Sequence, residues 1–348
     1  MKQKNFKEIY DKIYANVGQE MEAKRKAVLR KDILAFVIAL AVWILIIKNG
    51  LLVYSQVLVI GMILTIIALA FVLQKINKDY KRSYKDGIIW EIVKLSNPRL
   101  SYSDIEGISS RDYAESGFDF GWDRYHTEDL ISGTLEDGSL LKMAQVHTEE
   151  ERTTRDSDGH TSTTYVTTFL GLYGIIQLKM ATRADFMIKN NSKFAKFNKN
   201  RIEMESAEFE KYYDVYSNQL KSSEIRQNAM EILTPETIEE FVKIRNLFKR
   251  PINVRVSGNK IYFRIEVGDI FEPPTFRSSL NFDMLQKYFL IIDVPRMLYE
   301  ILIDNILVMY GNQEEKENRN IAKMTDEQRE EYRKQKREEL RKTYFSHN

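Results

Sequence analysis

The chain has 348 residues, and its 52 basic and 50 acidic side chains leave a net charge of only +2. A dedicated nucleic-acid binder usually carries a clear positive excess, so no nucleic acid is expected as a partner. Cysteine is absent, which excludes disulfides, thiol nucleophiles and thiolate-bound zinc.

Residues 1–32 predict an amphipathic N-terminal helix. Apolar side chains recur at the spacing of one helical face, namely Phe6, Ile9, Tyr10, Ile13, Tyr14, Val17 and Met21. This helix could lie on anionic lipid, or it could pack on the protein's own cytoplasmic domain or on a second copy. Acidic residues are mixed with lysines on the opposite face, which favours packing on protein.

Residues 33–74 predict a transmembrane helical hairpin. Ile33–Ile47 is fifteen residues without a charge, and Leu51–Leu73 is twenty-three. The second stretch extends roughly 34 Å, enough for a ~30 Å hydrocarbon core, whereas the first is short. Basic side chains are expected at the membrane interfaces, where their long stems can reach the headgroups: Arg30, Lys31, Lys48, Lys75 and Lys78.

Two other interpretations of these apolar stretches are less favoured. A cleaved signal peptide would need a small-residue cleavage site after the first stretch, and none follows it. A buried soluble hairpin would show a polar stripe, which Leu51–Leu73 lacks.

The basic residues also predict an orientation. Residues 1–32 contain nine Lys and Arg, residues 75–87 contain five, and the connecting loop contains one. The positive-inside rule then predicts a two-pass protein of a bacterial cell membrane with both termini in the cytoplasm. Neither apolar stretch carries an ionisable side chain in its interior, so a transporter or pump is not expected.

After the membrane segment, residues 75–98 predict a juxtamembrane helix that ends before Asn97-Pro98. Residues 99–311 then predict a cytoplasmic domain that opens with strands. Asp129–Leu135 and Ser139–His147 flank a turn with Gly138, and Tyr165–Lys179 is a long strand in which Gly171 and Gly174 suggest a bend or bulge. The polar stretch Thr148–Thr164 is expected to be an exposed, mobile hairpin loop.

The second half of this domain mixes helices and strands. Expected in chain order are a strand over Arg201–Ser206, a short helix over Ala207–Tyr213, a helix capped by Thr234 and running to Phe248, a hairpin of Ile252–Val256 with Lys260–Val267, and helices over Asn281–Ile292 and Pro295–Tyr310. The fold class is therefore α+β, a mixed antiparallel sheet with helices packed on one face. Residues 312–348 predict a charged tail, helical or disordered.

One stretch, residues 115–129, has an unusual composition of acidic, aromatic and glycine residues. It predicts a binding edge, with candidate residues Phe118, Trp122, Asp123, Tyr125, Glu128 and Asp129. It equally suits a buried connection whose aromatic side chains enter the core, and this interpretation is slightly favoured.

Local signatures of catalysis are missing from the sequence. It contains no phosphate-binding loop, no dinucleotide fingerprint and no serine-hydrolase elbow, and its four histidines stand in no metal-ligand spacing. Asp156–His160 is only a partial match to a calcium loop. We therefore expect no cofactor and no metal.

Together these features predict a membrane-anchored, noncatalytic binding or scaffold protein that presents its domain at the cytoplasmic face. Membrane lipid and another membrane or envelope protein are the expected partners, and a homo-oligomer stays open. The alternative is a membrane-bound hydrolase or lipid-modifying enzyme that uses carboxylates of the 115–129 stretch.

The chain also resembles a family of uncharacterised bacterial membrane proteins, known as a domain of unknown function and often encoded near LemA-type proteins. The resemblance rests on short motifs over most of residues 1–310: Tyr84-Lys85, Pro98-x-Leu100-x-Tyr102, Ser116-Gly117-Phe118, Asp123-x-Tyr125, Glu128-Asp129-x-Ile131-x-Gly133, Phe169-Leu170-Gly171-Leu172-Tyr173, Glu208-Phe209-Glu210-Lys211, Val215-Tyr216-Ser217 and Leu233-Thr234-Pro235. It implies two N-terminal transmembrane helices before a cytoplasmic α+β domain, and it implies no catalytic residues.

Overall fold

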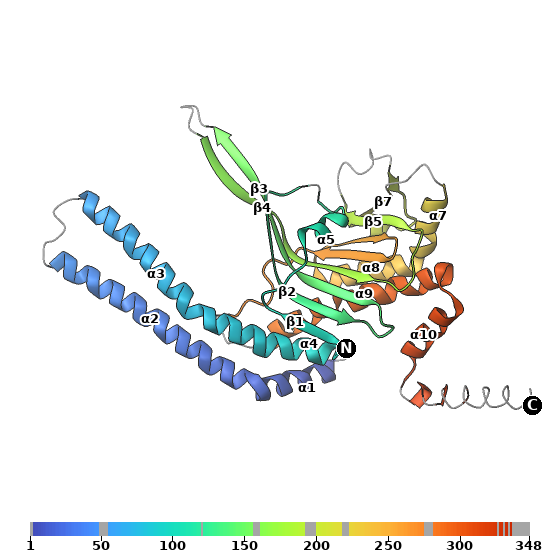
Figure 1. The fold of residues 1–348 in the computed structure, drawn as a ribbon, viewed down its shortest axis with the longest axis horizontal. Coiled ribbons are helices and arrows are strands. Elements are labelled where there is room, and N and C mark those ends of the chain that lie inside the picture. Colours follow the sequence, from blue (N-terminus) through green and yellow to red (C-terminus); the bar gives the residue numbers. More distant parts are fainter. Residues whose placement is uncertain are drawn as a thin grey trace, which may run out of the picture.

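Two long helices project from a body built of one large sheet and its covering helices (Figure 1). The computed structural model describes residues 3–48, 55–119, 121–155, 161–191, 200–217, 223–274, 281–325, 327–329, 331–332 and 335.

Within these residues, the strands form a single antiparallel sheet in the order β1-β2-β3-β4-β9-β8-β5-β7-β6. Their bounds are β1 (Leu100–Ser103), β2 (Arg124–Thr134), β3 (Leu140–Arg155), β4 (Thr161–Gln177), β5 (Asp185–Asn190), β6 (Arg201–Ile202), β7 (Tyr213–Tyr216), β8 (Ile252–Ser257) and β9 (Lys260–Ile265). The strand predicted over Arg201–Ser206 is thus only two residues long. The large antiparallel sheet with helices confirms the α+β class.

The helices are α1 (Gln3–Ile13), α2 (Gln19–Lys48), α3 (Ser55–Tyr84), α4 (Trp90–Ser96), α5 (Ser110–Glu115), α6 (Ala207–Glu210), α7 (Ser223–Ile232), α8 (Pro235–Phe248), α9 (Phe282–Tyr310) and α10 (Gln313–Lys323), with two π-helical turns, η1 (Tyr14–Gly18) and η2 (Lys85–Ile89). Helix α8 begins as expected, because the Thr234 side chain accepts the N–H of Thr237. In α10, Arg319 and Lys323 pair back to Asp304 of α9.

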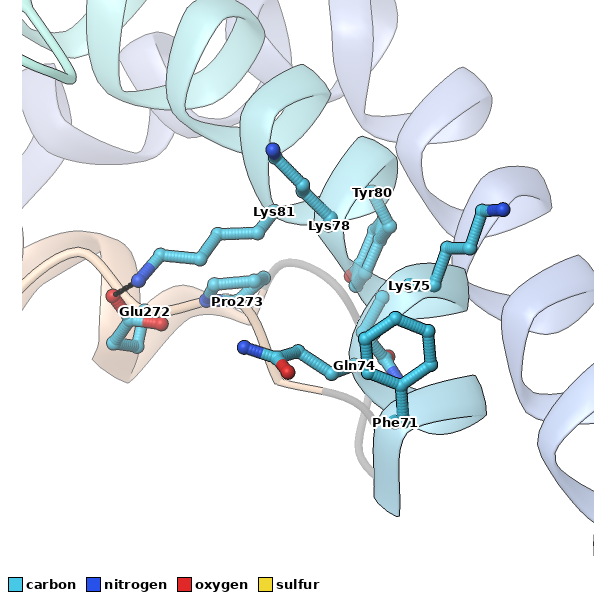
Figure 2. Close-up of a pocket in the computed structure, with 9 residues that line it drawn as sticks. Phe71, Gln74, Lys75, Lys78, Tyr80, Lys81, Glu272 and Pro273 are labelled. Carbon is cyan, nitrogen blue, oxygen red and sulfur yellow. Dashed lines mark ion pairs between the residues drawn. The ribbon is translucent and has the colours of Figure 1, made fainter. Parts of the chain in front are cut away.

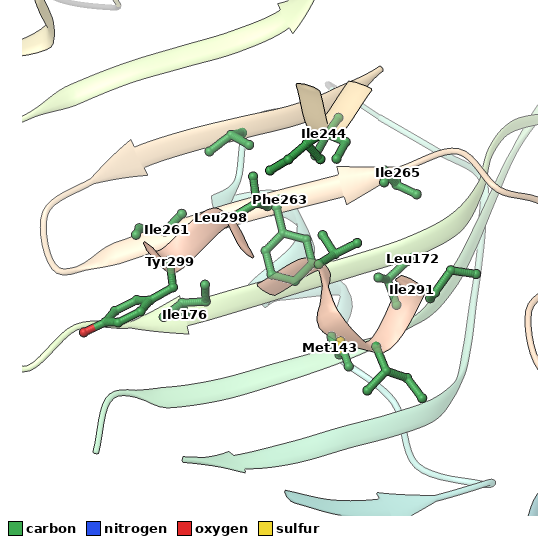
Figure 3. Close-up of a cluster of buried hydrophobic side chains, with 14 of the residues drawn as sticks. Met143, Leu172, Ile176, Ile244, Ile261, Phe263, Ile265, Ile291, Leu298 and Tyr299 are labelled. Atoms are coloured by element: carbon green, nitrogen blue, oxygen red, sulfur yellow. The ribbon is translucent and has the colours of Figure 1, made fainter. Parts of the chain in front are cut away.

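The main core lies between the sheet and α9 (Figure 3). Alternate residues of the central strands point to this face, including Leu172 and Phe263, and they meet Ile291 and Leu298 of α9. Ile244 of α8 joins the same cluster. A smaller buried cluster lies on the other face beneath α5, so helices occur on both faces rather than on one.

Helix α9 corrects a prediction, because the two helices expected around Pro295 are one continuous helix. Proline removes one backbone hydrogen bond and normally ends or kinks a helix. Here Pro295 itself is buried, and both halves of α9 bury apolar side chains against the sheet. Burial on both sides of the proline offsets the lost hydrogen bond.

The glycines of β4 also have a different role from the one expected. Pairing with β3 runs without interruption through Gly171 and Gly174, and the bulge expected in this strand lies instead at Thr168, which has no partner between Thr148 and Glu149. A Cβ at Gly174 would lie 2.2 Å from the Phe263 ring, and one at Gly171 would lie 2.1 Å from a backbone oxygen. These glycines therefore permit close packing rather than a bulge.

The stretch Thr148–Thr164, expected to be a loop, belongs largely to two paired strands. Pairing with β2 ends at Glu149 and pairing with β9 begins at Leu172, yet β3 and β4 stay paired out to Arg155 and Thr161. The result is a two-stranded ribbon, Glu149–Arg155 with Thr161–Thr168, that projects from the sheet (Figure 1). We call it the arm. Residues 156–160, which hold the partial calcium-loop match, lie outside the described residues.

Helices α2 and α3 lie side by side (Figure 1). Both leave large apolar side chains exposed. The Trp43 indole donates to the Thr65 hydroxyl at 3.2 Å across the pair. Exposed side chains include Ile66, at 66%, and Phe71, at 69%. Asp32 is buried at the base of α2, and the Asn77 amide lies 3.4 Å from its carboxylate.

Among the described residues, one helical stretch, Val59–Ser96, is long and apolar enough to cross a membrane. It includes most of α3. The apolar part of α2 is shorter than a typical membrane span. Only fifteen uncharged residues lie between Lys31-Asp32 and Lys48. The structure therefore supports membrane association through one helix, and it does not establish the two-span hairpin.

The N-terminal helix packs on the protein's own chain. Ile13 and Met21 are buried, and the Tyr10 ring lies 5.7 Å from the Phe282 ring at the start of α9. The apolar face predicted from the sequence thus meets the start of α9 and the turn η2.

Candidate functional site

The 115–129 stretch does not form one site, because its residues separate into three environments. The first lies beneath α5. The Asp119 carboxylate accepts a hydrogen bond from Arg264 at 2.6 Å, and the Glu115 carboxylate pairs with Lys260 at 2.8 Å. Phe118 is buried, with the Arg264 guanidinium 5.1 Å from its ring centre. These side chains tie α5 to β9.

Aromatic packing dominates the second environment. Trp122 lies 5.3 Å from Tyr113 and 5.7 Å from Tyr125, measured between ring centres. Both Trp122 and Tyr125 are half-buried, and the Tyr125 hydroxyl donates to the Ile108 carbonyl at 2.7 Å. Trp122 and Tyr125 therefore cover one face of the sheet, and their role in binding stays a prediction.

Next to this cluster, the stretch supports the root of the arm. The Asp123 carboxylate accepts the backbone N–H of Glu151 at 2.6 Å, and the Asp123 N–H donates to the Glu149 carbonyl at 2.8 Å. The Arg124 guanidinium lies 3.2 Å from the centre of the Tyr165 ring on the opposite strand. One end of the arm is therefore held from both of its strands.

The third environment holds Glu128 and Asp129 and is the candidate functional site. Strand β2 carries one extra residue here, since the register with β3 shifts between Glu128 and Ile131. Asp129 lies in this bulge with φ +62°, a left-handed conformation that aspartate tolerates better than most residues. The bulge turns the Asp129 carboxylate inward, where it is fully buried.

A buried lysine meets this carboxylate. Lys85 Nζ lies 2.6 Å from Asp129 Oδ2, and the Lys85 side chain is only 2% exposed. The Tyr102 hydroxyl donates to Asp129 Oδ1 at 2.5 Å. Each oxygen of the buried carboxylate therefore has a donor, as a buried charge requires.

Two further carboxylates surround the same ammonium group. Glu128 and Glu272 each place an oxygen 3.5 Å from Lys85 Nζ, and Lys81 Nζ lies 2.6 Å from Glu272. An ammonium group thus occupies the centre of three carboxylates, the position that a metal cation would otherwise take. We call these five side chains, Lys81, Lys85, Glu128, Asp129 and Glu272, the ion cluster.

The helix geometry explains how Lys85 reaches this place. It opens η2, a π-helical turn in an otherwise continuous helix from Ser55 to Ser96, and the Trp90 N–H donates to the Lys85 carbonyl. A π-turn rotates the following residues relative to a regular α-helix, and such turns often mark functional positions.

Gln145 holds in place the segment that carries Glu272. It stands opposite Glu128 in the β2–β3 register, and its side-chain oxygen Oε1 accepts the backbone N–H of Ile270 at 2.6 Å. This contact fixes the segment that carries Glu272 next to the bulge. Phe271 within it has φ +63° and packs edge-on against Tyr102.

Burial sets the charge state of the cluster. It raises the pKa of Asp129 to about 6, although the nearby Lys85 ammonium and the Tyr102 hydroxyl act to lower that pKa. Burial and the neighbouring carboxylate raise the pKa of Tyr102 far above its ordinary value, so the phenol keeps its proton. Lys85 and Asp129 at the centre of the cluster are inaccessible, whereas Lys81 and Glu272 at its edge are partly exposed.

The predicted membrane-interface residues are not members of the ion cluster. Arg30, Lys31 and Lys48 are exposed on α2, while Lys75 and Lys78 are exposed on α3. Lys75 and Lys78 line a cavity of about 690 Å³ where α3 passes Glu272 and Pro273 (Figure 2). Sequence reasoning missed this cavity and did not assign Lys85, Tyr102 or Glu272 to a site.

A comparison with known families adds one finding. Residues 167–302 match the model of a family of proteins of unknown function, DUF3137. The matched part extends from β4 into α9 and contains Glu272, while Lys85 and Asp129 precede it. No curated protein and no solved structure matches the chain.

The ion cluster predicts an asymmetric response to substitution. Lys85→Met would leave buried carboxylates without their central cation, and we expect a loss of about 3–5 kcal/mol in the free energy of unfolding. Asp129→Asn keeps the bulge conformation and removes a charge that burial disfavours, so we expect a loss of no more than about 1 kcal/mol at pH 7. Denaturant unfolding of the purified full chain measures both.

The double variant Lys85→Met/Asp129→Asn is the matched control. It should be more stable than Lys85→Met alone, because the most deeply buried carboxylate no longer lacks a cation. Equal losses for the two single variants would contradict the central role of the ammonium group.

The raised pKa of Asp129 also predicts a pH dependence. The folded value of about 6 lies above the ordinary 3.8, so the folded state binds more protons between these two values. The stability that Asp129 contributes is complete below about pH 4 and is lost as pH rises through about 6. Unfolding of the wild type and of Asp129→Asn between pH 4 and 7 should show a steeper fall in the wild type. Parallel curves would contradict this assignment.

Proposed function

We propose that this chain is a membrane-anchored, noncatalytic binding or scaffold protein, which presents its α+β domain at the cytoplasmic face of a bacterial membrane. One observation carries the proposal. The helix suited to cross a membrane continues without a break into η2, whose first residue, Lys85, is buried in the ion cluster. From Leu73 to Lys85 is about 18 Å along the helix axis. The anchor and the domain would therefore move as one body.

A two-pass topology with cytoplasmic termini is part of the proposal. Helix α2 lies alongside α3 and exposes an apolar surface of its own, including Leu40 at 62%. Its apolar part is short, so Arg30, Lys31 and Lys48 would have to extend to the interfaces. The basic residues at the domain end of both helices support this orientation.

The carboxylates of the 115–129 stretch favour binding over catalysis. Glu115 and Asp119 pair with cations, Asp123 accepts a backbone N–H, and Glu128 and Asp129 face Lys85. A general acid or base must reach substrate, and each of these groups already has a partner. A membrane-bound hydrolase or lipid-modifying enzyme would need one of them released.

The arm is the part of the domain best placed to meet a partner. It extends on the same side of the body as the free ends of α2 and α3 (Figure 1). Beyond Glu149 and before Leu172, its outer edges pair with no other described strand. Open edges are unfavourable in hydrocarbon but readily accept a strand of another protein. We propose that the partner is another membrane or envelope protein that covers this arm.

Cysteine labelling tests the anchor, and the cysteine-free chain makes this simple. A thiol reagent that cannot cross membranes should label Asn49→Cys in intact cells, whereas Lys142→Cys, exposed on β3, should react only after permeabilisation. The protein should also stay in the membrane after an alkaline carbonate wash. Labelling of Lys142→Cys in intact cells would contradict the orientation, and release by carbonate would contradict the anchor.

Site-specific crosslinking tests the arm. A photoreactive residue at Thr153 or Thr163, which face each other across the arm, should capture a membrane or envelope protein in native membranes. The same residue at exposed Glu239 of α8 is the matched control and should capture this protein at least tenfold less. Equal capture from the arm and from Glu239 would contradict the arm as the binding element. If a second copy of this chain is captured, the partner at the arm is another molecule of the same protein.

An isosteric substitution that removes one carboxylate charge separates the scaffold from the enzyme. Glu128→Gln should leave abundance and arm crosslinking unchanged and should also leave the cellular role intact. If the cellular role is lost while abundance and crosslinking are preserved, the result would favour the alternative function, a membrane-bound hydrolase or lipid-modifying enzyme.

A further inference from the structure

The cavity beside α3 has the chemistry of a lipid-headgroup site. It is about 690 Å³ in volume, and six of the residues that line it are Phe71, Gln74, Lys75, Asn77, Lys78 and Lys81 (Figure 2). Phe71, Lys75 and Lys78 follow one another at i, i+4 and i+7, so they share a helical face. The apolar ring stands toward the membrane end of α3 and the ammonium groups toward the domain.

The lysines that line the cavity differ in their ion-pair partners. Lys81 is paired with Glu272 at 2.6 Å, which neutralises the carboxylate in the cavity wall. Lys75 and Lys78 form no ion pair with any residue that the structure describes, and both are exposed. Two positive charges therefore remain for an anion at the level where α3 would leave the hydrocarbon.

A neutral acceptor lies in the same cavity. The Asn77 side-chain oxygen is buried and has no hydrogen-bond partner among the described residues, while the Asn77 nitrogen donates to the Leu73 carbonyl at 2.8 Å. A buried acceptor without a donor is costly, so a ligand hydroxyl would stabilise this site. Phosphate oxygens alone could not fill this role, because they accept hydrogen bonds.

We propose that this cavity binds the headgroup of an anionic phospholipid that carries hydroxyl groups, of the phosphatidylglycerol type. Lys75 and Lys78 bind the phosphate, Asn77 accepts a headgroup hydroxyl, and an acyl chain leaves along Phe71. Basic pockets at the cytoplasmic ends of membrane helices recognise lipid headgroups through this combination of charge and depth. This inference rests on the membrane-anchored role proposed above.

The site would also connect lipid to the ion cluster. Lys81 lines the cavity and pairs with Glu272, and Glu272 lies 3.5 Å from Lys85. A bound anion near Lys81 would compete with Glu272 for its ammonium group.

Native mass spectrometry of the full chain, released from nanodiscs of equal phosphatidylglycerol and phosphatidylcholine, tests the proposal. We expect the wild type to retain phosphatidylglycerol preferentially. Lys75→Gln/Lys78→Gln should weaken this retention by about fivefold per lysine, or roughly thirtyfold together. The matched control, Arg30→Gln/Lys31→Gln, removes two interfacial charges from α2 outside the cavity and should weaken it by less than fivefold.

Equal losses in the two double variants would overturn the site, since they would show general attraction to an anionic surface. Retention of both lipids alike, or displacement of the bound lipid by soluble glycerol phosphate, would also overturn it. Both double variants should unfold at the same temperature as the wild type, which would show that they fold. If the chain stays in carbonate-washed membranes but shows no lipid preference, this site alone is refuted. If carbonate releases the chain, the membrane anchor is refuted as well.

Discussion

One buried ammonium group organises the junction of helix and sheet. Lys85 comes from the helix that carries the membrane-suited stretch, Asp129 from a bulge in β2, and Glu272 from the segment between β9 and α9. A charge removed from water is stable only when compensating charges and hydrogen bonds surround it. The three elements must therefore come together for any of these groups to be buried.

This arrangement has a consequence for how the protein could work. A helix joined to a domain by a flexible linker would transmit nothing from the membrane to that domain. Here the helix is continuous through η2 and α4 and ends next to β1. A shift or tilt of α3 would have to move the β2 bulge and the Glu272 segment with it. The same coupling gives the proposed lipid site beside Lys81 a direct contact with the sheet.

The 115–129 stretch shows how neighbouring residues of similar composition can be placed in different environments. Its aromatic and acidic residues have the character of a binding edge, yet Phe118 is buried and Asp123 caps a backbone N–H at the root of the arm. Among its described residues only Ser116, Phe118 and Asp129 are buried, so neither a binding edge nor a buried connection describes the whole stretch. It holds the root of an arm whose own residues are mainly threonine and glutamate.

Local features of this protein could be predicted from the sequence by itself. The apolar run of α3, the Thr234 cap, the Gly138 turn and the β8–β9 hairpin depend on neighbouring residues, and those signals lie within a few positions of one another. The tertiary structure alone decided that Lys85 and Asp129 meet, that α9 continues through Pro295, and that the polar stretch after Thr148 forms an arm. These outcomes depend on a π-turn, a one-residue bulge and burial against distant strands, and the free energy of such contacts is not encoded in any local pattern.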